Sequence, residues 1–352
     1  MPEFNFLTTH LGSVPHPVIG DLPQHLVELL DIPAWTQHPR RSFHENMYSQ
    51  YTPGLPGVVV DELREKVSVD TRTDLSPALE QFYNSYLADD LDAFALHPDY
   101  APGFFAMLEN LRAQPEGQRL STWAKGQVTG PISFGLTVTD QDLRASLYNE
   151  QMADVIIKNT AMLGRWQARQ LQTARENTII FLDEPYLASF GSAFISLSRA
   201  QVTAYLDEIY EAIHAEGALG GVHCCANTDW GLLLATQVDI LNLDAYGYIQ
   251  NLALYPLELR EFLDRGGAIC WGIVPNNENI LQETPSGLAE RLRNGLELIH
   301  NKAAARGMRI TTDELAARSL LAPACGLGST SVEIAGLVFE VLAETSRILK
   351  RG

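Results

Sequence analysis

Short apolar runs alternate with amphipathic helical patterns along the chain from about residue 118 onward. The runs are nearly continuous, which is typical of parallel strands buried on both faces. Strands are predicted at Arg119–Val128, Asn177–Leu182, Ala218–Cys224, Val238–Leu243, Ala268–Val274 and Ser319–Ala324. Apolar residues at three- and four-residue spacing predict the helices that follow them, over Gln141–Leu171, Leu197–Ala215, Asp229–Thr236, Pro256–Leu263, Gly287–Ala305 and Ser331–Leu349.

The N-terminal third of the chain is less regular. Phe6–Leu11 is predicted as the first strand, and Gly57–Val60 is the candidate for the second. With these two, eight strand–helix units predict an α/β fold, a single (β/α)₈ TIM barrel with an enlarged N-terminal helical section, over residues 1–352. The alternative is a doubly wound sheet, but no glycine-rich nucleotide-binding motif follows the first strand.

Composition narrows the class of protein. The chain has 43 acidic and 25 basic residues, a formal charge of −18, which argues against nucleic acid and anionic membranes as partners. No apolar run approaches the roughly 20 residues of a membrane helix, and the first residues do not resemble a signal peptide. We therefore expect a cytoplasmic enzyme whose four cysteines are reduced.

Polar residues recur at the predicted carboxyl ends of the strands, where (β/α)₈ barrels carry their chemistry. His223 and Cys225 stand two residues apart at one strand end, and Cys325 follows the last strand. One imidazole and two thiolates suit Zn²⁺, and three protein ligands leave a fourth position open, as in catalytic sites. The alternative is three unrelated residues packed in the core. Cys224 and Cys270 are predicted to be core residues.

Two carboxylates, Asp183 and Glu184, precede Pro185 at another strand end. Paired acids can hold a substrate ammonium group or perform acid–base catalysis, and the alternative is a solvated loop or a helix cap. Asp244 ends the strand after His223, where it can complete the metal shell or orient the imidazole.

Four motifs follow one another along the chain: Leu11-Gly12-Ser13-Val14-Pro15, Asp183-Glu184-Pro185, His223-Cys224-Cys225 and Pro323-Ala324-Cys325-Gly326-Leu327. Together and in this order, they resemble the catalytic half of cobalamin-independent methionine synthase. The similarity extends from residue 8 to about residue 345. This family belongs to a superfamily that includes uroporphyrinogen decarboxylase and corrinoid-linked methyltransferases.

The resemblance implies a (β/α)₈ barrel and zinc bound by His223, Cys225 and Cys325. The family's fourth ligand, a glutamate, aligns with Asp244, whose side chain is one methylene shorter. In the family, zinc activates an acceptor thiol that receives a methyl group. The implied activity is therefore S-methyl transfer of the methionine-synthesis type, from a methyl-folate or methyl-corrinoid donor to a thiol such as homocysteine.

The same resemblance implies the residues that hold the acceptor. Ser13 and Asp183 match positions that bind the homocysteine backbone, and Gly12 matches a main-chain contact. Asp183 and Glu184 are the expected catalytic residues, although Glu184 brings no defined role from the family.

This sequence also departs from the family. The family enzyme has two barrels, whereas this chain has room for one. The family's GEPERND-type segment is not visible between residues 60 and 90, and Gly272–Asn276 lacks the family's proton-donor histidine. A corrinoid protein as methyl donor therefore stays open beside folate.

Two other functions stay open. Pro33–Trp35 followed by Arg40 and Arg41 is similar to the N-terminal arginine motif of uroporphyrinogen decarboxylase, in which such arginines bind substrate carboxylates. That lyase needs no metal and leaves the His-x-Cys motif unexplained. A zinc- or corrinoid-binding relative without turnover is the other alternative.

Overall fold

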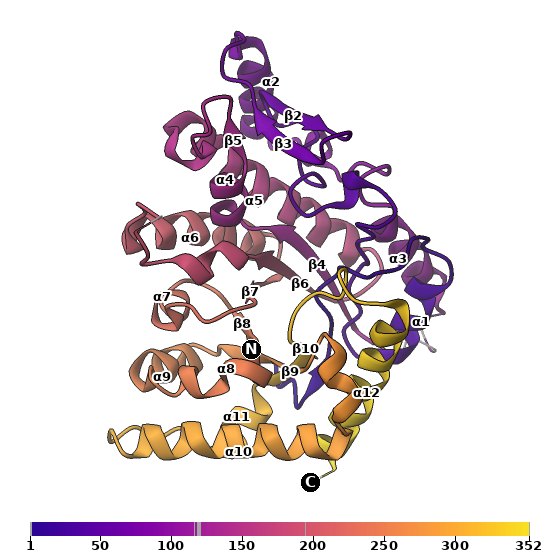
Figure 1. Ribbon diagram of the computed structural model, residues 1–352, viewed down its shortest axis with the longest axis vertical. Helices are drawn as coiled ribbons and strands as arrows, with labels where there is room; N and C mark the ends of the chain where they lie inside the picture. The colour runs from indigo at the N-terminus through magenta and orange to yellow at the C-terminus, as the bar shows by residue number, and fades with distance from the viewer. Residues whose placement is uncertain (1, 116, 118–120, 194, 352) are drawn as a thin grey trace.

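The computed structural model describes residues 2–115, 117, 121–193 and 195–351. Its centre is a mixed α/β arrangement in which seven parallel strands form a sheet that curls into an open barrel (Figure 1). Neighbouring strands follow the order β1-β10-β9-β8-β7-β6-β4. These strands are β1 (Leu7–Thr8), β4 (Trp123–Thr129), β6 (Asn177–Asp183), β7 (Leu219–Cys224), β8 (Ile240–Leu243), β9 (Ala268–Val274) and β10 (Ser319–Pro323).

The chain also forms helices, most of which cover the outer side of the sheet. They are α1 (Leu22–Leu29), α2 (Ser76–Leu87), α3 (Pro102–Ala113), α4 (Pro131–Thr137), α5 (Glu150–Gln172), α6 (Arg199–Ala215), α7 (Trp230–Leu234), α8 (Ala245–Leu252), α9 (Pro256–Asp264), α10 (Pro285–Ala304), α11 (Thr312–Ala317) and α12 (Val332–Lys350). In Figure 1, α6, α7, α9 and α10 are stacked on one side, and α1, α3 and α12 lie on the other. Short 3₁₀ turns are η1 (Phe43–Glu45), η2 (Leu91–Phe94), η4 (Ser146–Tyr148), η5 (Pro185–Ser189) and η6 (Glu278–Gln282).

The elements predicted from residue 121 onward are confirmed, with their ends shifted by a few residues. Residues 119 and 120 of the predicted Arg119–Val128 strand lie outside the described residues. The largest shift is at α5, which begins nine residues after the predicted start because Asn149 caps it there. The Asn149 Oδ1 accepts the Met152 N–H at 3.1 Å.

Successive side chains of each strand point to opposite faces of the sheet, so the core has two layers. On β6, Ile179 and Phe181 pack in the cluster inside the curled sheet, whereas Ile180 and Leu182 pack in the larger cluster under the helices. This alternation follows from the two-residue period of a strand. The same division confirms both predicted core cysteines, with Cys270 buried inside the sheet and Cys224 buried outside it.

Between β1 and β4 the strand ladder is not closed. An extended segment over residues 32–37 lies in this gap. The Ile32 N–H donates to the Thr8 carbonyl at 2.9 Å, and the Lys125 N–H donates to the Pro33 carbonyl at 2.9 Å. Pro33 has no N–H to donate, so no regular ladder forms there. The barrel therefore has seven strands in its sheet, where eight were predicted.

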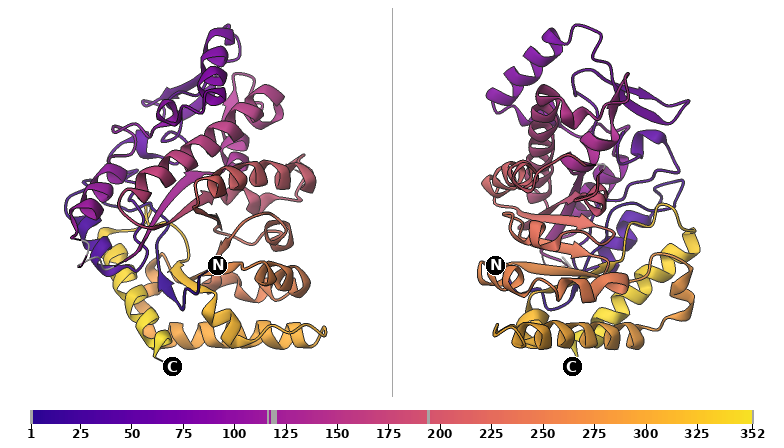
Figure 2. Two further views of the ribbon diagram at one scale, coloured as in Figure 1. Left: turned by 180° about the vertical axis from the view of Figure 1, so that it is seen from behind. Right: turned by 60° about the vertical axis from the view of Figure 1, so that its left-hand side comes forward.

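The candidate second strand, Gly57–Val60, does form a strand, but its predicted place in the barrel is wrong. Its residues belong to β2 (Val58–Asp61), which pairs antiparallel with β3 (Lys66–Val69) in a separate small sheet completed by β5 (Thr139–Asp140). A tight connection favours this local hairpin over a place in the barrel. The views in Figures 1 and 2 show the hairpin and α2 at one end of the molecule, opposite α10. The expected N-terminal enlargement thus contains a small sheet as well as helices.

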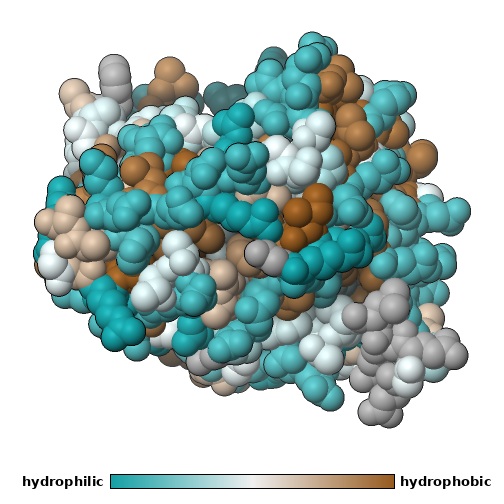
Figure 3. Space-filling view, turned by 90° about the horizontal axis from the view of Figure 1, so that it is seen from below, coloured by the Kyte–Doolittle hydropathy of each residue, from teal (hydrophilic) through white to brown (hydrophobic). Residues whose placement is uncertain are grey.

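The surface is mixed in character. The face shown in Figure 3 is mainly hydrophilic, with smaller hydrophobic groups between the polar side chains. Among the described residues, no helix is both long enough and apolar enough to cross a bilayer.

Candidate metal centre and active site

Three predicted ligands meet at the carboxyl end of the sheet. His223 lies near the end of β7, Cys225 follows that strand, and Cys325 follows β10. Their ligand atoms all lie within 4.8 Å of one another. The two-residue spacing turns His223 and Cys225 to the same side, and the curl of the sheet brings β10 round to meet them. The prediction that these three residues form one group is confirmed.

The group fits a tetrahedral zinc ion. Zn–S bonds of about 2.3 Å and Zn–N bonds of about 2.0 Å place neighbouring ligand atoms about 3.5 Å apart in a tetrahedron. The distance between His223 Nε2 and Cys325 Sγ is 3.5 Å. One imidazole with two sulfurs is a donor set that zinc prefers over magnesium or calcium. The residues present therefore fit the ion that the sequence suggests.

The thiols are electrostatically coupled. Hydrogen bonds from Cys325 and His223 lower the pKa of the Cys225 thiol, and the Cys225 thiolate in turn raises the pKa of Cys325. Burial lowers the pKa of His223, but hydrogen bonding and charge from Cys225, together with the Asp183 charge, raise it overall. One thiolate is thus favoured even before a metal binds, and thiolate is the ligand form of cysteine.

A residue that the sequence analysis missed supports the imidazole. Asn242 on β8 is completely buried, and its Oδ1 lies 2.5 Å from His223 Nδ1. The signal was present in the sequence, because Asn242 is the one strongly polar residue inside the apolar run Ile240–Leu243.

Asp244 does not join the three ligands in this arrangement. Its carboxylate caps α8 and accepts the Gly247 N–H at 2.8 Å. It lies outside the group of ligand atoms that fall within 4.8 Å of one another. The predicted orienting contact with His223 is made by Asn242. A direct bond from Asp244 to a metal therefore stays a prediction.

A cavity of 470 Å³ opens beside the three ligands. Asp183 and Ser13 line it, as predicted for groups that hold an acceptor. Asp183 is 8% exposed, and its buried Oδ1 has no hydrogen-bond partner among the described residues. Burial raises the pKa of Asp183 to about 6, although the charges of His223 and Lys125 oppose this. Asp183 thus brings a buried carboxylate to the wall of the cavity.

Much of the cavity wall comes from residues that the sequence did not mark. The segment between residues 37 and 47 covers one side, and a glycine-rich turn after β10 covers another. No lysine or arginine side chain is among the described lining residues. The lining residues are Leu11, Ser13, Gln37, Pro39, Glu45, Asn46, Met47, Asp183, Pro185, His223, Cys225, Cys325, Gly326, Gly328 and Ser329.

Glu184 faces a different way from Asp183. It is completely buried, and its two carboxylate oxygens accept the Ile132 N–H at 2.9 Å and the Ser133 N–H at 2.7 Å, in the first turn of α4. Burial raises the pKa of Glu184 to about 7, although these hydrogen bonds oppose the rise. Glu184 does not line the cavity. Its contacts tie the end of β6 to α4, and its predicted catalytic role stays a prediction.

Ser13 and Gly12 have different surroundings. Ser13 touches the turn after Cys325, where a Cβ on Gly326 would lie 2.1 Å from its hydroxyl oxygen. Gly12 has a φ of +88° and uses both backbone groups inside the protein. Its N–H donates to His10 Nδ1 at 3.1 Å, and its carbonyl accepts the Gln37 N–H at 3.0 Å. The Gly12 N–H is therefore engaged, and the predicted substrate contact of the Gly12 backbone stays a prediction.

Arg40 and Arg41, which the lyase alternative requires as substrate ligands, are engaged with the protein. Arg40 donates to the Ser329 carbonyl at 3.0 Å, and Arg41 forms an ion pair with Glu45 at 2.5 Å. Neither arginine lines the cavity. Their geometry does not favour a carboxylate-rich substrate.

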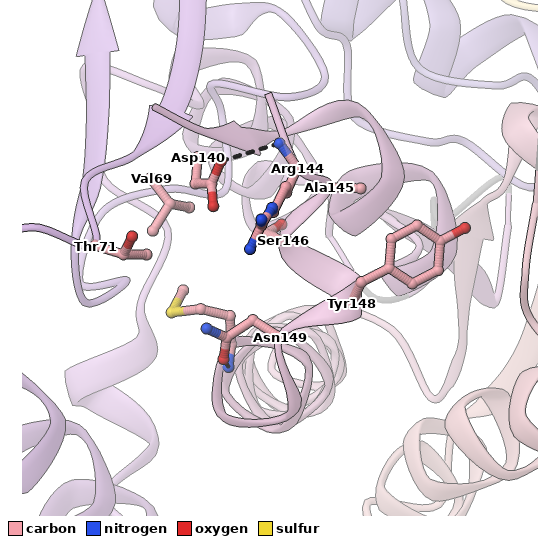
Figure 4. A pocket seen from close by; sticks show the side chains of 9 residues that line it. Val69, Thr71, Asp140, Arg144, Ala145, Ser146, Tyr148 and Asn149 are labelled. Atoms are coloured by element: carbon pink, nitrogen blue, oxygen red, sulfur yellow. Dashed lines mark hydrogen bonds between the residues drawn. The ribbon is translucent and has the colours of Figure 1, made fainter. Parts of the chain in front are cut away.

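Another, smaller cavity lies between the small sheet and the start of α5 (Figure 4). Its volume is 160 Å³, and its lining includes Thr71, Asp140, Arg144 and Asn149. It contains none of the predicted site residues.

Comparison with known proteins places this site on a known fold. No family model and no curated protein sequence matches the chain. Among solved structures, it is similar to a B12-independent methionine synthase from Shewanella sp. W3-18-1 in complex with selenomethionine, with 16% identity, 98% of each chain covered and a TM-score of 0.57. It is also similar to a methyltransferase from Methanosarcina mazei, with 12% identity, 96% of this chain and 92% of that chain covered, and a TM-score of 0.53. The chain has their fold.

These structures confirm the resemblance predicted from the motifs at the level of the fold. The TIM-barrel-like character of the chain is likewise supported, with the sheet open between β1 and β4.

Proposed function

We propose that the protein is a zinc-dependent methyltransferase that transfers a methyl group to the sulfur of a small thiol, as in methionine synthesis. The observation that carries the proposal is the group of His223, Cys225 and Cys325 beside a cavity on a fold found in a methionine synthase and a methyltransferase. We also propose that residues 1–352 act as one catalytic domain, because the methionine synthase neighbour matches the chain over 98% of both lengths. The reduced cysteines agree with a cytoplasmic location.

The three ligand residues would hold the ion with one position open toward the cavity. Zinc bound there would favour the thiolate form of an acceptor thiol. The sulfur electron pair then forms the new S–C bond, and the bond between the methyl group and its donor breaks with its electrons remaining on the donor. Methyl-folate and a methyl-corrinoid are the two proposed donors. The protein's part is to orient the acceptor sulfur for this in-line transfer.

Asp183 would hold the acceptor's ammonium group. Its carboxylate belongs to the wall of a cavity whose described lining includes no lysine or arginine, and its Oδ1 has no hydrogen-bond partner among the described residues. Ser13 adds a hydroxyl on the same wall. Homocysteine carries both an ammonium group and a thiol, and the neighbour from Shewanella binds selenomethionine, an amino acid of similar size. These features support an amino-acid thiol as the acceptor.

Metal analysis combined with a transfer assay tests the proposal. Protein purified under reducing conditions should contain about one zinc per chain, and Cys225→Ser should lose it. Methylation of homocysteine should then be measured with methyl-folate and with methylcobalamin as alternative donors. Zinc-free protein after metal supplementation, or zinc-loaded protein that methylates none of a panel of thiols, would exclude the proposed activity.

A further inference from the structure

Asn242 links three neighbouring strands inside the barrel through its side chain. In the sheet register His223 on β7 lies beside Asn242 on β8, and Asn242 lies beside Cys270 on β9. The Asn242 Nδ2 donates to the Cys270 carbonyl at 2.8 Å, and Oδ1 lies 2.5 Å from His223 Nδ1. Strand pairing therefore fixes this link, and no flexible loop takes part in it.

The direction of these bonds determines the tautomer of His223. Because the amide nitrogen of Asn242 donates to a carbonyl, the oxygen of the same amide faces the imidazole. An amide oxygen only accepts, so His223 Nδ1 must carry the proton. In the neutral imidazole, which is the form that binds a metal, the lone pair is therefore on Nε2, which lies 3.5 Å from Cys325 Sγ and faces the metal group.

We propose that Asn242 is a positioning residue that holds His223 in the Nδ1–H tautomer, with Nε2 directed at the metal. Ligating histidines commonly donate their second N–H to a carboxylate or a carbonyl, and this contact orients the ring. Asn242 is uncharged, so it orients the imidazole without adding a negative charge to two thiolates. Asp244, which is the carboxylate nearest in sequence, caps α8 instead.

Two variants separate the acceptor role of Asn242 from its structural role. Both Asn242→Ala and Asn242→Asp lose the donor to the Cys270 carbonyl, but only Asn242→Asp keeps an oxygen for His223 Nδ1. We expect Asn242→Ala to weaken zinc binding about 10- to 100-fold, measured by competition with a chromophoric chelator. Asn242→Asp should recover most of this affinity. Asn159→Ala, which removes another buried amide that donates to the Tyr51 carbonyl, should leave zinc affinity unchanged.

The tautomer is measured directly in the metal-free protein, at a pH high enough for the His223 imidazole to be neutral, because the imidazolium carries a proton on both nitrogens. Long-range ¹H–¹⁵N spectra of protein labelled at histidine, with His223→Gln for assignment, should show His223 protonated at Nδ1 in the wild type and in Asn242→Asp. Asn242→Ala should shift the population toward Nε2–H. A neutral wild-type His223 that carries its proton at Nε2, or an Asn242→Ala protein with unchanged zinc affinity, would overturn the inference. If Asn242→Ala does not fold, the spectra of the wild type and of Asn242→Asp still show whether His223 is held in the Nδ1–H tautomer.

This inference rests on the proposed function only through the metal. A wild-type protein that binds no zinc refutes the proposed function. A wild-type protein that binds zinc, with Asn242→Ala binding it equally well, refutes the positioning role alone.

Discussion

Replacing Asp183 by asparagine should stabilise the metal-free protein while it weakens acceptor binding. Asp183 is buried, its Oδ1 has no partner among the described residues, and its pKa is raised from the ordinary value of 3.8 to about 6. The folded protein therefore favours the neutral acid, and ionisation near neutral pH costs folding free energy. Asparagine has similar size and no charge, so it removes that cost.

The magnitude follows from the shift. A change of about two pKa units corresponds to roughly 3 kcal/mol at about 1.4 kcal/mol per unit. Because the folded pKa lies above the unfolded one, the wild type loses this stability as pH rises from about 4 to above 6. The advantage of Asp183→Asn should therefore be near zero at pH 4 and approach about 3 kcal/mol above pH 6.

Urea unfolding of the chelator-treated wild type and variant across this pH range measures the difference. Asp92→Asn, at an exposed position, serves as the matched control and should show no such pH-dependent gain. An Asp183→Asn protein whose added stability is the same at pH 5 and pH 8 would refute the reasoning that the burial of the Asp183 charge outweighs the favourable charges of His223 and Lys125.

Three further outcomes are expected. Homocysteine should be methylated at least about 10-fold more efficiently than 4-mercaptobutyrate, which lacks the ammonium group. Asp183→Asn should remove this preference. A variant that still prefers homocysteine to the same extent as the wild type would contradict the assigned contact. Gly130→Ala should lower the free energy of unfolding by about 1–3 kcal/mol, because the Cβ of the alanine would lie 2.2 Å from Glu184 Oε1. Gly336→Ala, in an open helical position, is the control and should not lower the free energy of unfolding. Cys270→Ala should keep its zinc in metal analysis, because Cys270 lies outside the ligand group.

The fold could be predicted wherever strands leave a pattern of apolar residues. Strands β6 to β10 are buried on both faces, and their continuous apolar runs marked them in the sequence. The segment over residues 32–37 leaves no such pattern, because Pro33 interrupts it and it pairs through single hydrogen bonds. The valine-rich residues of β2 do leave the pattern of a strand, but they pair with β3 outside the barrel. Periodicity identifies a strand without identifying its partner.

Residues of the candidate site could be predicted from the sequence only where they belong to predicted strands. His223 and Cys225 could be grouped from the sequence, because side chains two residues apart on a strand point to the same side. Cys325 joins them because the predicted barrel brings the end of the last strand to the same rim. The cavity residues Glu45, Asn46 and Met47 could not be predicted, since they come from an irregular segment whose path depends on tertiary packing.

The different directions of the adjacent acids Asp183 and Glu184 could have been predicted from the geometry of a strand. Neighbouring residues at the end of an extended strand point to opposite sides, so two consecutive carboxylates are poorly placed to share one substrate contact. In the structure Asp183 faces the cavity, whereas Glu184 accepts hydrogen bonds from α4. The glycine at 130 allows that approach, because a Cβ there would meet the Glu184 carboxylate. The motif thus combines one acid that faces the proposed acceptor with one that holds the strand end in place.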